Sequence, residues 1–383
     1  MVYFWKRLVY ILVQTTLGGK RMRKLFKTGV PTLLLLTLVV SGCSFGSNKA
    51  MQEMDTPQIN YVDEGEALDE ETELIGSEEQ PIEEQAETEE GPVETVTREL
   101  YLIDQNGMVV SKTFDLPKTQ GVLRQSLEYL VDGGPVSNLL PSGFQAVLPA
   151  GTEVDVHFKE DERTAVADFS EEFRSYNPEQ ELQILQSITW TLTQFENVDK
   201  VQIRINGYDQ ETMPVGNTPI GEGYSRANGI NLEKSEVADV VNSKGVTLYF
   251  LAQNGDNTYY VPVTRRVKNT DDSIKEVVNQ LLSGPSIYSN LLTDIRNGAE
   301  LLDSPKYENG VVTLNFNEAI LNQMENTAIS DEVLNLIVLS LTEQPGVEKV
   351  AIEVNGEAKV LKVSGEPLTE PVSRPVNVNT GKF

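Results

Sequence analysis

Two long stretches of the sequence are copies of one another, and this internal duplication constrains the fold more than any other feature. Leu100-Tyr-Leu-Ile-Asp-Gln-Asn-Gly107 returns as Leu248-Tyr-Phe-Leu-Ala-Gln-Asn-Gly255, and Gly134-Pro135 returns as Gly284-Pro285. A unit of this length is a small independent domain, unlike the roughly 20–50-residue unit of a solenoid. The duplication therefore predicts a first domain at residues 97–220 and a second at 245–368. A linker at 221–244 joins them, and a tail follows at 369–383.

Further matches keep an offset of 147 to 152 residues between the copies. They are Ser137-Asn-Leu-Leu140 with Ser289-Asn-Leu-Leu292, Asp168-Phe-Ser170 with Asn315-Phe-Asn317, Val198-Asp-Lys-Val201 with Val347-Glu-Lys-Val350, and Ile205-Asn-Gly207 with Val354-Asn-Gly356. A constant offset over this length indicates that both copies have the same order of elements. Within the linker, Gly229-Ile-Asn-Leu232 is apolar enough to pack between the domains and hold their orientation.

Hydrophobic periodicity predicts the order β-β-α-β-β-α-β in each copy. The last strand alternates at Val201, Ile203 and Ile205, and one helical face is marked by Ile274, Val277, Val278, Leu281 and Leu282. Asn177-Pro178 and Ser330 are expected to cap the second helices, Ser273 and Glu276 form a capping-box pattern, and both first helices are expected to stop at Gly-Pro. We expect the α+β class, with two helices packed on one face of a small sheet.

The N-terminal region has the pattern of a lipoprotein signal. Arg23, Lys24 and Lys27 precede an apolar run of about a dozen residues, too short to span a bilayer, and Val40-Ser-Gly-Cys43 follows it. This order predicts a signal peptide at 1–42, with Cys43 as the acylated first residue of the mature protein, palmitate being one expected chain. Met22 starts a well-proportioned signal by itself, which suggests that residues 1–21 are an over-extended start.

The mature protein is strongly acidic. Glu53 to Glu99 contains 18 acidic residues and one basic residue, within a chain of net charge −27. Residues 43–96 cannot bury enough apolar surface to offset their chain entropy, so we expect a disordered tether. The acidic surface argues against nucleic-acid binding, which relies on Lys and Arg.

These features together resemble the GerM family of sporulation and germination lipoproteins of spore-forming Firmicutes. The most specific parts are the Leu-Tyr-x-x-x-x-Asn-Gly opening, the Gly-Pro helix stop and the Val-x-Lys-Val…Asn-Gly strand, each present twice. The resemblance implies tandem GerMN domains, which are similar to the ring-building domains of secretion-type assemblies. It also implies a role in the space between mother cell and forespore, at the extracytoplasmic face of a membrane.

No pattern of catalytic, metal-binding or cofactor-binding residues emerges. The single Cys and the single His, His157, do not allow a Cys-His or Ser-His-Asp arrangement or a usual zinc site. Gly216, Gly221 and Gly223 have the composition of a surface loop and do not match dinucleotide-binding spacing. We therefore expect no cofactor and no metal.

Carboxylates are the remaining route to catalysis, as in glycosidases. Asp168, Glu171 and Glu172 end a strand of the first copy, but Asn315 stands where Asp168 would be in the second. This exchange favours a role in the turn and helix entry over acid catalysis. For Trp190 on the second helix, packing in the core or an interface is favoured over stacking on a sugar.

The sequence thus predicts a non-enzymatic, membrane-tethered scaffold. Its partners would be the membrane through Cys43 and either further copies of itself in a ring or channel complex or other sporulation envelope proteins. The alternative is a lipoprotein that binds a ligand or cell-wall glycan such as peptidoglycan, which predicts an aromatic-lined groove between the domains. A weaker alternative is a wall hydrolase that depends on Glu171 and Glu172.

Overall fold

A computed structural model describes residues 94–233, 241–270, 272–321, 328–358 and 360–380. Cys43, the predicted signal peptide and nearly all of the predicted tether lie outside the described residues. In the described part of the chain, none of the helices has both the length and the apolar character needed to cross a membrane.

The first repeat contains two sheets. One has the order β2-β1-β3 and the other β4-β5-β6-β7, with β8 also pairing with β6; β5 and β6 are parallel. The elements are β1 (Thr95–Asp104), β2 (Val109–Pro117), α2 (Val122–Glu128), β3 (Phe144–Gln145), β4 (Val154–Lys159), β5 (Thr164–Phe169), α3 (Glu181–Leu192), β6 (Lys200–Ile205), β7 (Tyr208–Asp209) and β8 (Tyr224–Ser225).

The second repeat follows the same plan. Its β9 and β10 form a long hairpin, β11-β12-β14-β17 form a four-stranded sheet, and β13-β15-β16 form a small third sheet. The elements are β9 (Ser243–Asn254), β10 (Asn257–Lys268), α4 (Ser273–Leu282), β11 (Lys306–Glu308), β12 (Val311–Phe316), β13 (Ala328–Ile329), α5 (Asp331–Thr342), β14 (Lys349–Val354), β15 (Val360–Lys362), β16 (Pro367–Leu368) and β17 (Val372–Ser373). The short 3₁₀ helices of both repeats are η1 (Pro135–Asn138), η2 (Glu160–Glu162), η3 (Glu171–Arg174), η4 (Pro178–Gln180), η5 (Arg226–Asn228) and η6 (Glu318–Ile320).

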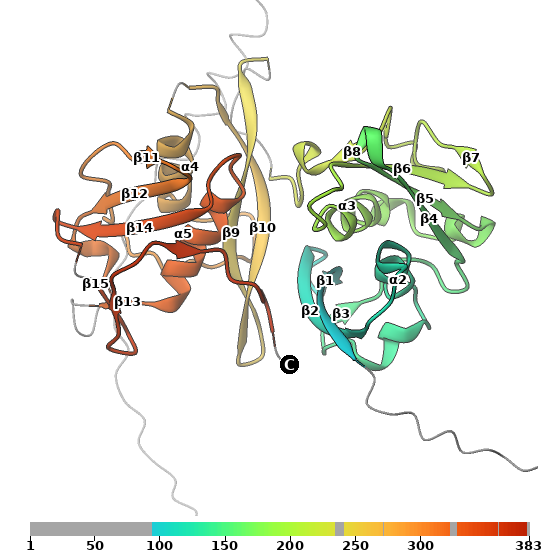
Figure 1. Ribbon diagram of the computed structural model, residues 1–383, viewed down its shortest axis with the longest axis horizontal. Coiled ribbons are helices and arrows are strands. Elements are labelled where there is room, and N and C mark those ends of the chain that lie inside the picture. Colours follow the sequence, from blue (N-terminus) through green and yellow to red (C-terminus); the bar gives the residue numbers. More distant parts are fainter. Residues whose placement is uncertain (1–93, 234–240, 271, 322–327, 359, 381–383) are drawn as a thin grey trace, which may run out of the picture. The chain divides into compact units, whose positions relative to one another are not determined.

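The α+β class is confirmed, but the strands of the first repeat divide between two sheets and those of the second among three, where a single sheet was expected in each. In the first repeat α3 lies between β1–β3 and β4–β6 (Figure 1), and it packs on both β1 and β6. The helix completes the free edge of β1, because the Tyr101 amide donates to Thr191 Oγ1 at 3.1 Å and the Tyr101 carbonyl accepts from Ser187. In the second repeat the Tyr249 amide donates to Ser340 Oγ at 2.9 Å. An edge covered in this way does not need a further strand.

Helix ends follow the sequence in part. Ser330 accepts the Val333 amide at 3.2 Å, which confirms the expected cap of α5. Asn177 accepts the Glu179 amide at 3.1 Å, but it caps η4, and α3 begins only at Glu181 without a side-chain cap. The capping box at Ser273 is wrong, because α4 is capped one residue earlier by Asp272, which accepts the Lys275 amide at 3.0 Å. Gly284 ends α4 in a left-handed conformation, whereas α2 stops at Glu128, well before its Gly-Pro.

Candidate functional site between the two repeats

Each repeat ends in an arm that continues the duplication past residues 220 and 368. The first arm, Tyr224–Glu233, pairs through β8 with β6, and the second arm, Val372–Thr380, pairs through β17 with β14. The first arm thus occupies part of the predicted linker, and the second arm is an ordered part of the predicted tail. Both arms carry the same short sequence pattern, at 225–231 and at 373–379. It begins with a Ser-Arg pair, and five residues after the Ser comes Ile-Asn in the first arm and Val-Asn in the second.

Two equivalent asparagines join β2 of the first repeat to β10 of the second. Asn231 accepts the Val109 amide at 2.8 Å and donates to the carbonyls of Val109 at 2.8 Å and Pro262 at 2.7 Å. Asn379 accepts the Tyr260 amide at 2.7 Å and donates to the carbonyls of Tyr260 at 2.8 Å and Ser111 at 2.9 Å. Each asparagine therefore binds its own repeat twice and the other repeat once, which is the pattern of a two-fold interface.

The arginines of the arms meet on one carboxylate. Arg226 Nη1 lies 3.2 Å from Glu343 Oε2, and Arg374 Nη2 lies 2.9 Å from Glu343 Oε1. The side chains also bind equivalent threonines, since Arg226 Nε donates to Thr193 Oγ1 at 3.0 Å and Arg374 Nη1 to Thr342 Oγ1 at 3.2 Å. Burial by itself would raise the pKa of Glu343, but Arg226 and Arg374 outweigh it and hold the pKa below its ordinary value.

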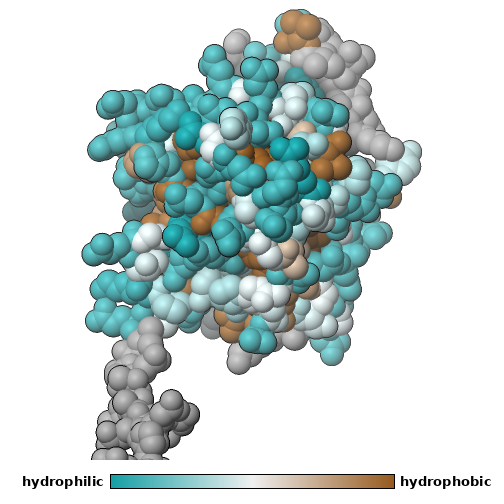
Figure 2. Space-filling model, turned by 90° about the vertical axis from the view of Figure 1, so that its right-hand side faces the viewer, coloured by the Kyte–Doolittle hydropathy of each residue, from teal (hydrophilic) through white to brown (hydrophobic). Residues whose placement is uncertain are grey.

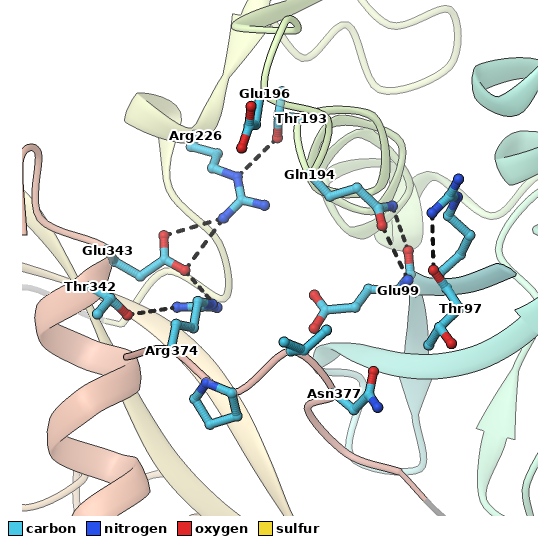
Figure 3. A pocket seen from close by; sticks show the side chains of 13 residues that line it. Thr97, Glu99, Thr193, Gln194, Glu196, Arg226, Thr342, Glu343, Arg374 and Asn377 are labelled. Carbon is cyan, nitrogen blue, oxygen red and sulfur yellow. Dashed lines mark hydrogen bonds and ion pairs between the residues drawn. The ribbon is translucent and has the colours of Figure 1, made fainter. Parts of the chain in front are cut away.

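A cleft of about 570 Å³ opens beside these arginines (Figure 3). It is lined by Thr97, Arg98, Glu99, Thr193, Gln194, Glu196, Arg226, Thr342, Glu343, Arg374, Pro375, Val376 and Asn377. Burial raises the pKa of Glu99, opposed by the charges of Arg374 and Arg226. None of the lining residues is aromatic, so this cleft lacks the platform that the glycan-binding alternative predicts for a groove between the domains.

Trp190 is a buried packing residue, as one of the two sequence interpretations expects. Its side chain is fully buried, the guanidinium carbon of Arg226 lies 4.2 Å from its ring centroid, and its ring lies 5.6 Å from that of Tyr101. With Val109 and Ile230 these two aromatic residues form a small buried cluster. The Ile230 amide also donates to Thr264 Oγ1 of the second repeat at 2.9 Å, and Asn231 binds both Val109 and Pro262, so Gly229–Leu232 lies between the two repeats as expected. A ring covered in this way is not available to stack on a sugar.

The carboxylates considered for catalysis hold a turn. Asp168 accepts the Gly207 amide at 3.0 Å, and Asn315 in the second repeat accepts the Gly356 amide at 2.9 Å through its side-chain oxygen. Glu171 lies 3.1 Å from Arg174. Because the Asn315 amide oxygen makes the same contact as the Asp168 carboxylate, this position supports the Asn-Gly turn in both repeats. Glu172 is exposed.

The glycine-rich loop likewise has a structural role. Amides of the loop, from Val215 at 3.1 Å and Thr218 at 2.8 Å, donate to Glu181, a fully buried carboxylate that also accepts from Tyr176 at 2.8 Å. Burial opposes the charge of Glu181, but these hydrogen bonds outweigh it and lower the pKa. Since the loop already encloses an internal anion, its amides are not free for a phosphate. His157 is an exposed residue of β4.

Within the described ranges, no three His, Cys, Asp or Glu side chains gather closely enough to hold a metal ion. The cleft contains charged, amide and hydroxyl groups and lacks a histidine or cysteine. These groups can hold a polar ligand by ion pairs and hydrogen bonds, or hold the two repeats together.

The fold and the cleft define a tandem-domain α+β protein in which two copies of one domain are joined through their arms. The chain belongs to the GerM family: the family model described as "Germane: Sporulation and spore germination" matches residues 99–211 and 247–360. It is 49% identical over 357 residues to the spore germination protein GerM of Bacillus subtilis (strain 168), covering 92% of this chain and 97% of that protein.

The solved tandem GerMN domains of the sporulation protein GerM from Bacillus subtilis are similar in structure. The TM-score is 0.71 and the sequence identity 53%, covering 75% of this chain and 99% of that one. The resemblance inferred from the repeated motifs is therefore confirmed, including the tandem GerMN architecture.

Proposed function

We propose that this protein is a lipid-anchored scaffold of sporulation and spore germination that self-associates into a ring or channel complex at the membrane between mother cell and forespore. The observation that carries the proposal is a doubled domain locked into one unit, in a family of sporulation and germination proteins. Its effect would be steric: the lipid on Cys43 confines the protein to a surface, and confinement raises the effective concentration of weakly binding neighbours.

The mode of assembly is restricted by the contacts between the repeats. In a two-fold interface each partner contributes the same surface, so that surface cannot bind a further copy. Here the outer edges of β2 and β10 face one another through Asn231 and Asn379, so they are not available for a ring contact. A ring needs two different complementary surfaces elsewhere on the molecule.

One exposed apolar feature distinguishes the repeats. Ile287 and Tyr288 are inserted after Gly284-Pro285 in the second repeat only, and their exposed fractions are 89% and 85%. By contrast, the face of the first repeat in Figure 2 is mainly hydrophilic, with hydrophobic residues scattered between polar ones. We propose that the Ile287–Tyr288 tip is one half of a heterologous contact between neighbouring copies.

The test uses the full-length protein on lipid vesicles and in detergent, followed by sedimentation and electron microscopy. We expect oligomers for the wild type and loss of oligomers for I287S/Y288S. The matched control is L139S, which changes a 48% exposed residue in the equivalent loop of the first repeat and should assemble normally. A wild-type protein that stays monomeric at high concentration on vesicles would contradict the proposal.

The lipid anchor is tested separately by metabolic labelling with radioactive palmitate. Label should enter the wild type and be absent from C43S, which should also be released from the membrane fraction. Equal labelling of the two proteins would exclude Cys43 as the attachment point, whatever the outcome of the assembly experiment.

A further inference from the structure

The cleft between the repeats holds a guanidinium that is only partly used. Arg226 Nε binds Thr193, and Nη1 binds both oxygens of Glu343 at 3.4 and 3.2 Å. Nη2 forms no hydrogen bond within the described residues, and in Figure 3 it turns away from Glu343 into the cleft. The Arg226 side chain is 30% exposed, so this nitrogen can be reached by a ligand.

A carboxylate stands on the opposite wall. The backbone of Glu99 is held on both sides by Gln194, whose Oε1 accepts the Glu99 amide at 3.1 Å and whose Nε2 donates to the Glu99 carbonyl at 2.6 Å. This fixes the direction of the side chain, whose carboxylate points into the cleft in Figure 3. In the part of the chain that the structure describes, this carboxylate forms no ion pair; it accepts a backbone hydrogen bond from Val378, and burial makes its charge costly.

The two repeats differ at the positions that create this arrangement. Thr247 occupies the place of Glu99 in the second repeat, and Glu343 occupies the place of Gln194. Among the described residues of the cleft, Glu99 is thus a carboxylate without an ion pair on one wall, whereas Glu343 of the other repeat forms ion pairs with both arginines. A single anion would be repelled by Glu99 and Glu196, and a single cation by Arg226. A molecule that carries both charges meets a partner on each wall.

We propose that the cleft binds a small zwitterion, an amino acid or short peptide, with its ammonium group at Glu99 and its carboxylate at Arg226 Nη2. The volume of about 570 Å³ lies within the roughly 300–1,000 Å³ typical of small-molecule sites. Asn377 and Thr97, which also line the cleft, supply hydrogen-bonding groups for the polar part of the ligand. This binding function is independent of the scaffold role.

The experiment is isothermal titration calorimetry of the full-length protein in detergent, with four probes. These are alanyl-alanine, its N-acetyl derivative, its C-terminal amide and free alanine. We expect alanyl-alanine to bind at least tenfold more tightly than the two derivatives that lack one charge. Comparing its affinity with that of free alanine shows which length of ligand spans the cleft. Equal affinity for alanyl-alanine and its N-acetyl derivative, or no heat with any probe, would overturn the proposal.

Two variants locate the site. E99Q should weaken the binding of alanyl-alanine at least tenfold and leave the affinity for the N-acetyl derivative unchanged. The control is E308Q, which changes an exposed residue of β11 outside the cleft and should alter neither affinity. Weaker binding by E99Q cannot be attributed to unfolding, because the substitution removes a desolvated charge. The melting temperature of E99Q should therefore equal or exceed that of the wild type. Unchanged binding of alanyl-alanine by E99Q would place the ligand elsewhere and refute the assignment.

Discussion

At the scale of single residues, the contacts of residues 231 and 379 require an asparagine side chain at both positions. Both have positive φ, 46° and 58°, a conformation that asparagine tolerates better than most residues. Both also need an amide, because each side chain donates twice and accepts once from strand backbones. Aspartate has nearly the same shape but cannot donate to the two carbonyls.

We predict that N379D lowers the free energy of unfolding by about 2–4 kcal/mol, since two buried carbonyls lose their donors and a charge is brought among acceptors. N377D in the same arm changes an exposed residue and should cost little. Chemical denaturation of both variants measures the difference. A loss in N379D no larger than in N377D would contradict the bridging role.

A second residue-scale prediction concerns Asp168. Because Asn315 performs the equivalent turn contact, D168N should retain stability within about 0.5 kcal/mol, as expected for a substitution that preserves the interaction. D168A removes the acceptor for the Gly207 amide and should cost about 1 kcal/mol. Thermal melts compare the two. A large loss in D168N alone would show that the charge matters and reopen a chemical role.

At the scale of elements, buried hydroxyls on a helix replace a neighbouring strand. Ser187 and Thr191 of α3 bind the backbone of β1, and Ser340 of α5 binds that of β9. The arms then cover the opposite hairpin edges at β2 and β10. Each hairpin thus has its free edges covered by groups from distant parts of the chain.

Deleting the second arm, from Val372 onward, should therefore expose parts of β2 and β10. The Ser111 and Tyr260 carbonyls would lose Asn379, and Glu343 would lose Arg374. We expect a lower melting temperature and faster hydrogen exchange at β2 and β10, measured by mass spectrometry. A control deletion of the last three residues should leave the exchange unchanged. Protection of β2 and β10 that survives removal of the whole arm would contradict the model of a structural arm.

At the scale of the whole molecule, Glu343 couples the repeats, because its carboxylate binds one arginine from each arm. Its pKa is lowered, so its contribution to stability is complete above the unfolded value of about 4.3 and is lost as the pH falls through the lower folded value. E343Q should cost about 2 kcal/mol at pH 7, less than the roughly 3–5 kcal/mol of a fully buried pair, because its arginine partners remain 28–30% exposed.

Calorimetry of the full-length protein measures this effect. At pH 7 the wild type should melt at a higher temperature than E343Q, and the gap should close as the pH is lowered below about 4, where the carboxylate becomes protonated. E348Q, at an exposed position, is the matched control and should melt like the wild type at both pH values. A gap that persists unchanged in strong acid would mean that the charge of Glu343 does not couple the repeats.

Much of the fold could be predicted from local pattern. The alternation at Val201, Ile203 and Ile205 marks a strand with one buried face, and the cap at Ser330 could be predicted because capping needs only neighbouring residues. The placement of Asp272 as a cap was missed because Ser273 has equal intrinsic preference and geometry chose between them. The arms were missed because only three identical residues, Ser, Arg and Asn, and one similar position, Ile or Val, mark them.

The sequence by itself determined the duplication, the α+β class, the family and the absence of a recognisable catalytic pattern, since these depend on composition, periodicity and repetition along the chain. Only the tertiary structure decided that the strands of each repeat divide among more than one sheet, that the arms join β2 to β10, and that Glu99 faces Arg226 across a cleft. Those contacts join residues about one repeat apart, and no local preference encodes which distant edges, carbonyls and charges will meet when the chain closes on itself.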